Sequence, residues 1–471
     1  MNVPHLETPT NAMPKGVLRG WIIIAIAALL SFGLYEILPY DQNANKGLSL
    51  LFFIGTLWLT EAIHITITAL LVPVLAVLIG MPMIDTNDEV SPLTTIKALS
   101  TFADPIIFLF FGGFALAAAL HVQKLDRKIA MWVIALSRGH LGLAVLAICI
   151  VTAFLSMWIS NTATAAMMLP LALGLLSHFD AAKERKTFVF ILLGIAYSAN
   201  IGGLGTLVGS PPNAIAAKAL GYDFADWMKI GLPMMLLLFP AMLVSLYLVL
   251  RPKLNHRVEF KAEMIPWNRD RMLTMSLFVV TALGWIFSKN ISEQFGISQP
   301  DTWVAIAAAC MVVILGIATW KDISDNTDWG VLMLFGGGLS LSAVLNDSGS
   351  SLVLGQTLAN AFGGASPFLV IVVVAAFIIF LTELTSNTAS AALLVPVFAA
   401  IAAQMGLPKE ILVLVIGLGA SCAFMLPVAT PPNAIVFGTG HIQQREMMKV
   451  GFILNVLCIA VISIFFYLFF L

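Results

Sequence analysis

The sequence predicts an all-α polytopic membrane protein with about 11 transmembrane helices and two re-entrant helical hairpins, arranged as an inverted repeat. Three observations predict this fold class. Of the 471 residues, 60% are apolar and only 10% are charged, whereas soluble domains carry about 25% charged residues. The apolar residues form continuous runs long enough to cross a bilayer. Three short motifs occur twice in the same order. The net charge of −1 argues against nucleic acid as a partner.

Most of the apolar runs have the length of one membrane-spanning helix, which is about 20 residues. They cover residues 20–38, 48–64, 65–82, 105–121, 187–217, 230–250, 272–288, 302–319, 329–345, 411–440 and 450–471. Two other runs, 141–177 and 366–408, are longer. The first would form a helix of roughly 55 Å, against an apolar core of about 30 Å. Each long run therefore crosses twice or returns as a hairpin.

The basic residues predict the orientation of the chain. With the N-terminus in the cytoplasm and both long runs folded as hairpins, 18 of the 24 Lys and Arg residues face the cytoplasm, in agreement with the positive-inside rule. The C-terminus then lies outside. If residues 141–177 crossed the membrane twice, every loop would lie on the same side as in the hairpin arrangement. The charges therefore do not distinguish the two, and the prediction of a hairpin depends on the motif at the centre of the run.

We divide the chain into six parts on this basis. Residues 1–19 form a cytoplasmic N-terminal segment, and residues 20–121 form the scaffold helices of the first half. Residues 122–250 contain an interfacial arm together with the first hairpin, a broken helix and the helix that follows it, and residues 251–271 form a cytoplasmic connecting loop. Residues 272–345 form the scaffold helices of the second half, and residues 346–471 contain the second hairpin, its broken helix and the last helix.

Three sequence blocks repeat at a nearly constant offset. The pairs are Phe110–Leu116 with Phe335–Leu341, Leu155–Pro170 with Leu381–Pro396, and Ser210–Ile215 with Thr430–Ile435, at offsets of 225, 226 and 220. The same order and spacing indicate a duplication. An odd number of predicted crossings separates matching blocks, so the two halves have opposite orientations. Many secondary transporters are built from such inverted repeats.

Ser-Asn-Thr stands at the centre of both long runs, at residues 160–162 and 386–388. These residues are good helix N-caps and poor helix-interior residues, so they suit the turn of a hairpin. Carbonyl and side-chain oxygens at such a turn suit a small hard cation, and free N–H groups at the start of the second helix suit an anion. The alternative is simple capping or close helix packing. The second copy, at the matching position, favours a ligand site.

A second motif, Ser/Thr-Pro-Pro-Asn, follows each hairpin at residues 210–213 and 430–433. Glycines precede both copies, and Pro211 and Pro431 fit the first turn of a new helix. We expect two helices that are unwound at mid-membrane. Such backbone is tolerated only where protein or a watery cavity satisfies it. The alternative is a pair of proline-kinked helices without a ligand.

The paired motifs resemble those of the divalent anion:sodium symporter family, and are similar to bacterial INDY-type sodium/dicarboxylate transporters over essentially the whole chain. The resemblance implies sodium-coupled uptake of C4-dicarboxylates such as succinate. It further implies a homodimer in the bacterial inner membrane, with scaffold and transport parts and an elevator movement. The same fold could instead carry citrate or sulfate, or exchange dicarboxylates.

The resemblance also implies the site residues. A first sodium ion would bind Ser156, Ser160, Asn161 and the carbonyl of Gly209; a second would bind Thr382, Ser386, Asn387 and the carbonyl of Ala429. Substrate carboxylates would meet Asn161, Thr162, Ser210, Asn387, Thr388, Thr430 and Pro431. No Lys or Arg stands in a hairpin centre or an unwound segment. Hydroxyls, amides, helix N-termini and sodium must therefore hold a dianion.

A few other residues leave alternatives open. Glu383, in the second hairpin, could relay protons or form structural hydrogen bonds; Met157 takes its place in the first hairpin. Glu61 and His64 could bind a proton or a metal, or anchor the chain at the interface. No nucleotide-binding or metal-hydrolase motif is present, and we expect no organic cofactor. An intramembrane enzyme or a passive channel are remote alternatives.

Overall fold

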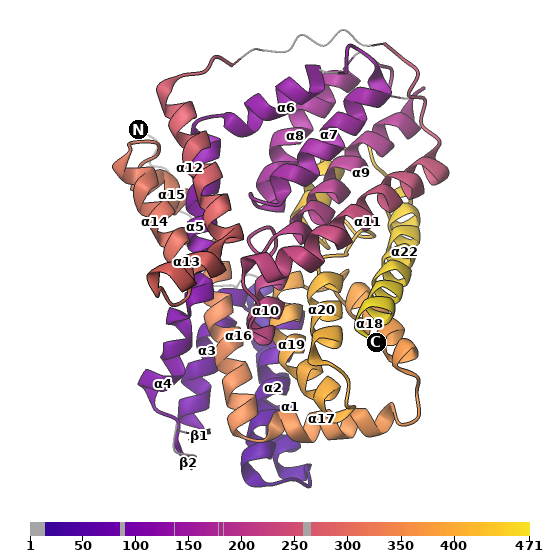
Figure 1. Ribbon diagram of the computed structural model, residues 1–471. Helices are drawn as coiled ribbons and strands as arrows, with labels where there is room; N and C mark the ends of the chain where they lie inside the picture. The colour runs from indigo at the N-terminus through magenta and orange to yellow at the C-terminus, as the bar shows by residue number, and fades with distance from the viewer. Residues whose placement is uncertain (1–14, 85–89, 136, 178, 182, 258–264) are drawn as a thin grey trace, which may run out of the picture.

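The computed structural model describes residues 15–84, 90–135, 137–177, 179–181, 183–257 and 265–471, and it is built almost entirely of helices (Figure 1). The predicted N-terminal segment 1–19 lies outside the described residues except for its last five, which begin the first helix. The predicted connecting loop 251–271 is described except for residues 258–264.

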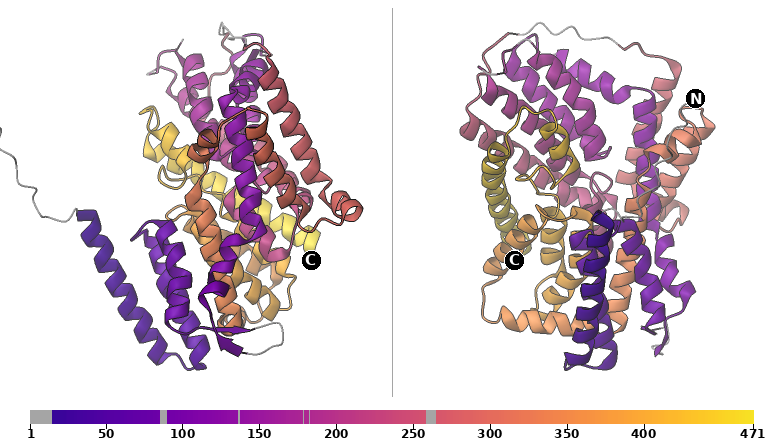
Figure 2. Two further views of the ribbon diagram at one scale, coloured as in Figure 1. Left: turned by 90° about the vertical axis from the view of Figure 1, so that its left-hand side faces the viewer. Right: turned by 180° about the vertical axis from the view of Figure 1, so that it is seen from behind.

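The first part of the chain forms three helices, a pair of short strands, a short fourth helix followed by a 3-10 turn, and a long fifth helix. The elements are α1 (Lys15–Ile37), α2 (Gln42–Thr60), α3 (Ile65–Leu78), β1 (Pro82–Ile84), β2 (Val90–Pro92), α4 (Thr95–Ser100), η1 (Thr101–Ala103) and α5 (Pro105–Val122). The strands are antiparallel, with Met83 opposite Ser91. Asp104 caps α5 by accepting a hydrogen bond from the N–H of Ile106. In Figure 2, α1 stands at the edge of the molecule, beside α2.

The second part contains the first long apolar run and the first predicted broken helix. The elements are α6 (Leu125–Ala135), α7 (Leu141–Ser156), α8 (Asn161–Leu176), α9 (Arg185–Gly202), η2 (Gly203–Gly205), α10 (Pro211–Leu220) and α11 (Phe224–Leu250). The long run is thus two helices, and its turn carries Ser160 as the N-cap of α8. Pro211 begins α10, because proline suits the first turn of a helix, where its missing N–H leaves no hydrogen bond unmade.

The third part returns to helices that pack beside α3 and α5. The elements are α12 (Arg269–Ile286), α13 (Ser288–Phe295), α14 (Pro300–Ile314), α15 (Trp320–Asn326), α16 (Trp329–Asp347) and α17 (Ser350–Ala361). The axes of α12 and α13 differ by 75°. Gly112 of α5 lies against the backbone of Ala305 in α14, and Gly337 of α16 lies against that of Ala69 in α3. A Cβ atom at either glycine would clash, so close helix contact explains both residues.

The last part has the same order of elements as the second: a hairpin of two helices, a broken helix and a long helix. The elements are α18 (Pro367–Leu381), α19 (Asn387–Gln404), α20 (Lys409–Gly419), α21 (Pro431–Phe437) and α22 (Gln444–Phe470). The second long run is again two helices, with Ser386 as the N-cap of α19. In Figure 1, α7 and α8 lie at the top and α17 lies at the bottom, near α19.

Among the described residues, seven helices are long and apolar enough to cross a membrane, or eight if the bent pair α12 and α13 forms one span. Shorter apolar helices include α7 and α8, each 16 residues long. A helix of that length extends about 24 Å, which is less than the apolar core of about 30 Å. The composition and these helices identify the chain as an integral membrane protein.

The two broken helices cross-pack. The second piece of the first, α10, packs against α20, and the second piece of the other, α21, packs against α9. The breaks of both helices are thereby brought to the same place, between the two hairpin turns.

Aromatic rings join the first hairpin turn to neighbouring helices. Trp158 of the turn stacks on Trp285 of α12 with ring centroids 6.5 Å apart and planes 6° apart. Phe224 of α11 stacks on Trp285 at 4.9 Å, and Phe278 of α12 meets Trp158 edge-on at 5.2 Å. Such pairs stabilise by about 0.5–1.5 kcal/mol beyond their buried area, so this cluster fixes the turn beside α12.

Candidate functional site

A cavity of about 730 Å³ lies where the two hairpin turns meet the two unwound segments. Its wall contains all the predicted site residues except Ser156 and Thr382, which are fully buried behind it. The predicted residues that line it are Ser160, Asn161, Thr162, Gly209, Ser210, Ser386, Asn387, Thr388, Ala429, Thr430 and Pro431. Residues far apart in the sequence therefore form one site.

The second helix of each hairpin and the second piece of each broken helix begin at this cavity, namely α8, α19, α10 and α21. Each capping serine hydroxyl accepts one hydrogen bond, Ser160 from the N–H of Ala163 at 3.2 Å and Ser386 from the N–H of Ala389 at 3.4 Å. The caps therefore leave other N–H groups of the first helical turn available. Helix N-termini carry partial positive charge and attract anions. The cavity wall is thus suited to carboxylate groups.

Charged side chains at the cavity are acidic. Glu61 and Asp328 line its wall, from the ends of α2 and the start of α16. No Lys, Arg or His belongs to the lining within the part of the chain that the structure describes. A doubly charged anion in the cavity therefore lacks a cationic side chain to balance it.

Oxygen atoms converge around Asn161. Its side-chain Oδ1 lies 2.6 Å from the hydroxyl of Ser156, which also donates to the carbonyl of Ala199 at 2.8 Å. The carbonyl oxygens of Gly209 and Ala199 each lie 3.2 Å from the same end of the amide. An amide rotated by 180° would place its NH2 group, with two hydrogens to donate, among these three oxygens, whereas the unrotated amide adds Oδ1 to them and makes a group of four oxygens. This donor set fits the first predicted sodium site.

The second half places its oxygens differently. Asn387 Oδ1 is buried and has no hydrogen-bond partner, and buried polar atoms are normally satisfied. The hydroxyl of Thr382 donates to the carbonyl of Ile379 in its own helix, at 3.1 Å. Asn387 thus offers an unused oxygen at the second predicted sodium site, while Thr382 lies behind it.

One asparagine tethers each unwound segment. Asn213 donates from Nδ2 to the carbonyls of Gly203 at 2.8 Å and Thr206 at 2.7 Å. Asn433 donates to the carbonyls of Ala423 at 3.2 Å and Leu426 at 3.0 Å. The bonds span ten and seven residues in both cases. The asparagine of Ser/Thr-Pro-Pro-Asn therefore satisfies backbone that the broken helix leaves unpaired.

Polar side chains also link the two broken helices to each other. The hydroxyls of Ser210 and Ser421 are 3.0 Å apart. On the matching side, Asn200 donates from Nδ2 to the hydroxyl of Thr430 at 3.1 Å. These contacts hold the starts of α10 and α21 at fixed positions in the cavity wall.

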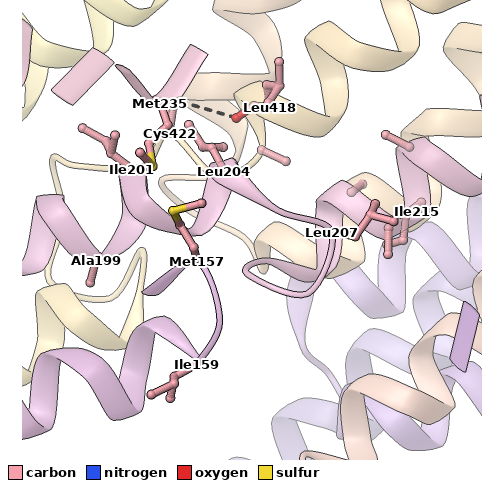
Figure 3. Close-up of a cluster of buried hydrophobic side chains, with 14 of the residues drawn as sticks. Met157, Ile159, Ala199, Ile201, Leu204, Leu207, Ile215, Met235, Leu418 and Cys422 are labelled. Carbon is pink, nitrogen blue, oxygen red and sulfur yellow. Dashed lines mark hydrogen bonds between the residues drawn. The ribbon is translucent and has the colours of Figure 1, made fainter. Parts of the chain in front are cut away.

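The first unwound segment rests on a cluster of buried apolar side chains, shown in Figure 3. Met157 and Ile159 of the hairpin turn, Leu204 and Leu207 of the segment, and Met235 of α11 belong to this cluster. A Cβ atom at Gly205 would come within 3.1 Å of both Met157 and Met235, so the two methionine side chains pack closely against this position. The apolar cluster keeps water away from one side of the candidate site.

The structure addresses the residues that the sequence left open. Glu383 accepts four hydrogen bonds from uncharged donors, which favours the structural alternative over a proton relay. His64 accepts from the N–H of Thr66 and caps α3, and Glu61 lines the cavity. Within the described residues, no three His, Cys, Asp or Glu side chains are placed to hold a metal ion.

Sequence reasoning missed the tethering and linking residues, Asn200, Asn213, Ser421 and Asn433, as parts of the site. A signal was available for two of them, because Asn213 and Asn433 occupy the same place in both copies of the second motif. Asn200 and Ser421 lie outside the repeated blocks, and only the fold brings them to the cavity.

Comparison with known proteins identifies the family. The family described as "Sodium:sulfate symporter transmembrane region" matches residues 22–470. The chain belongs to this family of sodium symporters. It is similar to an uncharacterized transporter of Haemophilus influenzae, with 56% identity over 96% of this chain and 98% of the relative. It is also similar to the sodium-dependent dicarboxylate transporter SdcS of Staphylococcus saprophyticus, with 33% identity over 95% and 90%.

Solved structures share the fold of this symporter family member at low sequence identity. The YdaH transporter of Alcanivorax borkumensis superposes with a TM-score of 0.54 at 14% identity, covering 88% of this chain and 97% of that one. MtrF of Neisseria gonorrhoeae gives a TM-score of 0.51 at 12% identity, covering 93% and 97%. The family assignment confirms the predicted resemblance and makes the chain a membrane transporter that uses sodium, not an enzyme.

Proposed function

We propose that the chain is a secondary active transporter that couples the uptake of C4-dicarboxylates such as succinate to sodium. One observation carries this proposal: both Ser-Asn-Thr turns and both unwound segments line a single cavity with no cationic side chain among its described lining residues. The charge of a dianion must then be balanced by helix N-termini and by cations that arrive with it. This requirement gives a physical reason for coupling.

In this proposal two sodium ions bind, one at each hairpin turn. The first would be held by Ser156, Ser160, Asn161 and the Gly209 carbonyl, and the second by Thr382, Ser386, Asn387 and the Ala429 carbonyl. The converging oxygens at Asn161 and the unpartnered Asn387 Oδ1 support these positions. The substrate carboxylates would meet Asn161, Thr162, Ser210, Asn387, Thr388, Thr430 and Pro431.

We further propose an inverted-repeat architecture that works by an elevator movement in a homodimer. The scaffold would comprise residues 20–121 and 272–345, and the transport part residues 122–250 and 346–471. The N-terminus would face the cytoplasm and the C-terminus the outside of the bacterial inner membrane. The identical spacing of the Asn213 and Asn433 hydrogen bonds and the cross-packing of α10 and α21 support the repeat.

A second candidate keeps the fold and changes the cargo. The family description names sulfate, while the SdcS relative is named for dicarboxylates. Sulfate or citrate transport, or dicarboxylate exchange, are therefore the competing functions. The relative's name and the two separate sets of anion-binding residues, one on each half, favour a substrate with two carboxylates.

The test is radiolabelled succinate uptake into proteoliposomes, with inward sodium, potassium or proton gradients imposed separately. We expect uptake with the sodium gradient alone, and inhibition by unlabelled succinate but not by sulfate. Uptake that ignores sodium and requires internal dicarboxylate would instead establish an exchanger. No succinate uptake under any gradient, together with uptake of radiolabelled sulfate or citrate, would establish the second candidate.

A further inference from the structure

Glu383 lies in the turn of the second hairpin, directly after Thr382, and is only 3% exposed. Its Oε1 accepts from the backbone N–H groups of Phe424 at 2.7 Å and Met425 at 2.9 Å, and its Oε2 accepts from Leu426 at 3.0 Å. Nδ2 of Asn455 in α22 also donates to Oε1, at 2.7 Å. Three consecutive N–H groups form an anion-binding nest, and here it is filled by the protein's own carboxylate.

In the first half, an uncharged group links the hairpin turn to the unwound segment. Met157 occupies the matching position, and its backbone carbonyl accepts from the hydroxyl of Thr206 in the first unwound segment. That segment begins with a short 3-10 turn at Gly203–Gly205. The second segment has no glycine between residues 420 and 430, and a carboxylate binds its N–H groups instead. The two hairpin turns therefore differ by one buried negative charge.

We infer that Glu383 is a positioning residue for the second sodium site and makes that site bind sodium more tightly than the first. The inference rests on the sodium sites of the proposed function. Glu383 fixes the segment that ends in the Ala429 carbonyl and Thr430. None of its four donors carries a charge, so the carboxylate charge is not neutralised by a partner. A charge buried beside a cation site attracts the cation strongly, because the surroundings have a low dielectric constant.

The test measures sodium binding at each half without requiring transport. Cys310 is exposed and is first changed to Ser, while the other three cysteines are buried. One reporter is Val428→Cys, beside Ala429, where the native side chain is 83% exposed. The matched reporter is Val208→Cys, beside Gly209 on the cavity wall. The rate of maleimide labelling of the purified protein is followed while sodium replaces potassium at constant ionic strength.

In the otherwise native protein, we expect sodium to slow labelling at both cysteines, with half-protection at a lower sodium concentration for residue 428. Glu383→Gln should raise that concentration at residue 428 by about tenfold or more, because a charged hydrogen-bond acceptor and its field are lost. At residue 208 the change should stay below about twofold, since additivity holds for separate sites. Asn455→Ala, which removes one of the four donors, should give a smaller rise at residue 428.

The outcomes separate this inference from the proposed function. Unchanged half-protection at residue 428 in Glu383→Gln, or an equal rise at both cysteines, would overturn the role of Glu383. No sodium effect at either cysteine in the native background would overturn the sodium sites themselves. If Glu383→Gln is not monodisperse on size exclusion, Glu383→Asp takes its place, because its shorter side chain cannot reach all three N–H groups and should act in the same direction.

Discussion

The rings of Phe110 and Phe335 pack against each other with centroids 4.9 Å apart and planes inclined by 56°. The two residues occupy matching positions of a repeated block, and both are almost fully buried. Phe110 lines the cavity that contains both Ser-Asn-Thr turns, while Phe335 lines a smaller cavity of about 270 Å³ that shares no residue with it. The pair therefore stands between the two cavities.

Replacing Phe110 with Ala should open a passage between these cavities, because it removes one half of the aromatic barrier. We expect radiolabelled sodium to leak from proteoliposomes in the absence of any substrate. Phe111→Ala is the control, since Phe111 packs against Trp320 and Trp329. Both variants lose an aromatic ring, which typically costs about 3–5 kcal/mol of stability when the ring is buried. Equal leakage from both variants would refute the barrier.

The hydroxyl of Ser156 should matter for sodium rather than for substrate, because it contacts Asn161 Oδ1 and the Ala199 carbonyl behind the cavity wall. In Ser156→Ala, we expect the sodium concentration for half-maximal uptake to rise by about fivefold or more, because the change removes one oxygen ligand of the ion and the hydrogen bond that positions Asn161. Maximal uptake should return at high sodium. The matched control is Thr152→Val, which removes a buried hydroxyl that donates to Ile148 one turn earlier in α7. A normal sodium curve for Ser156→Ala would exclude the serine as a ligand.

Asn213→Ala and Asn433→Ala should destabilise the protein, because each leaves two backbone carbonyls of an unwound segment without their donor. A buried polar group left unpaired costs about 1–3 kcal/mol. We expect less monodisperse protein after heating than for Asn290→Ala, where the side chain is exposed. Size-exclusion chromatography of heated samples gives the comparison. Identical heating curves would show that the tethers contribute little.

Lys218 of α10 forms an ion pair of 2.7 Å with Asp104, the N-cap of α5, and lines the smaller cavity. Because the pair ties a broken helix to α5, Lys218→Gln should make the smaller cavity more accessible. With Cys310→Ser as background, we expect Ser342→Cys in that cavity to be labelled about two- to fivefold faster, as a partly exposed pair contributes up to about 1 kcal/mol.

The control for this experiment is Lys229→Gln, since Lys229 pairs with Asp226 within α11 and does not line the smaller cavity. Faster labelling with Lys229→Gln as well would indicate general loosening. An unchanged rate with Lys218→Gln would show that the ion pair does not hold the cavity closed.

Local rules explain the part of the fold that the sequence predicts well. Ser160 and Ser386 begin helices because their hydroxyls cap them, and Pro211 and Pro431 begin helices because proline suits the first turn. These signals need only neighbouring residues. They fix both breaks in the long apolar runs, and the family resemblance then predicts the residues that line the cavity.

Long-range contacts explain the part that sequence reasoning does not reach. The N–H groups that bind Glu383 are 41 to 43 residues away in the chain, so no local pattern indicates the contact. Asn200 meets Thr430 across 230 residues. Short polar helices such as α13 and α15 also lack the apolar run by which the spans are recognised.

The stacked indoles of Trp158 and Trp285 have an optical consequence. Two indoles 6.5 Å apart and nearly parallel are close enough for their electronic transitions to couple, and we expect this coupling to contribute to the near-ultraviolet circular dichroism spectrum. Trp158 belongs to the first hairpin turn, while Trp285 belongs to α12. Any displacement of the hairpin relative to α12 separates the two chromophores, so the chain carries a spectroscopic reporter of its own conformation that needs no added label.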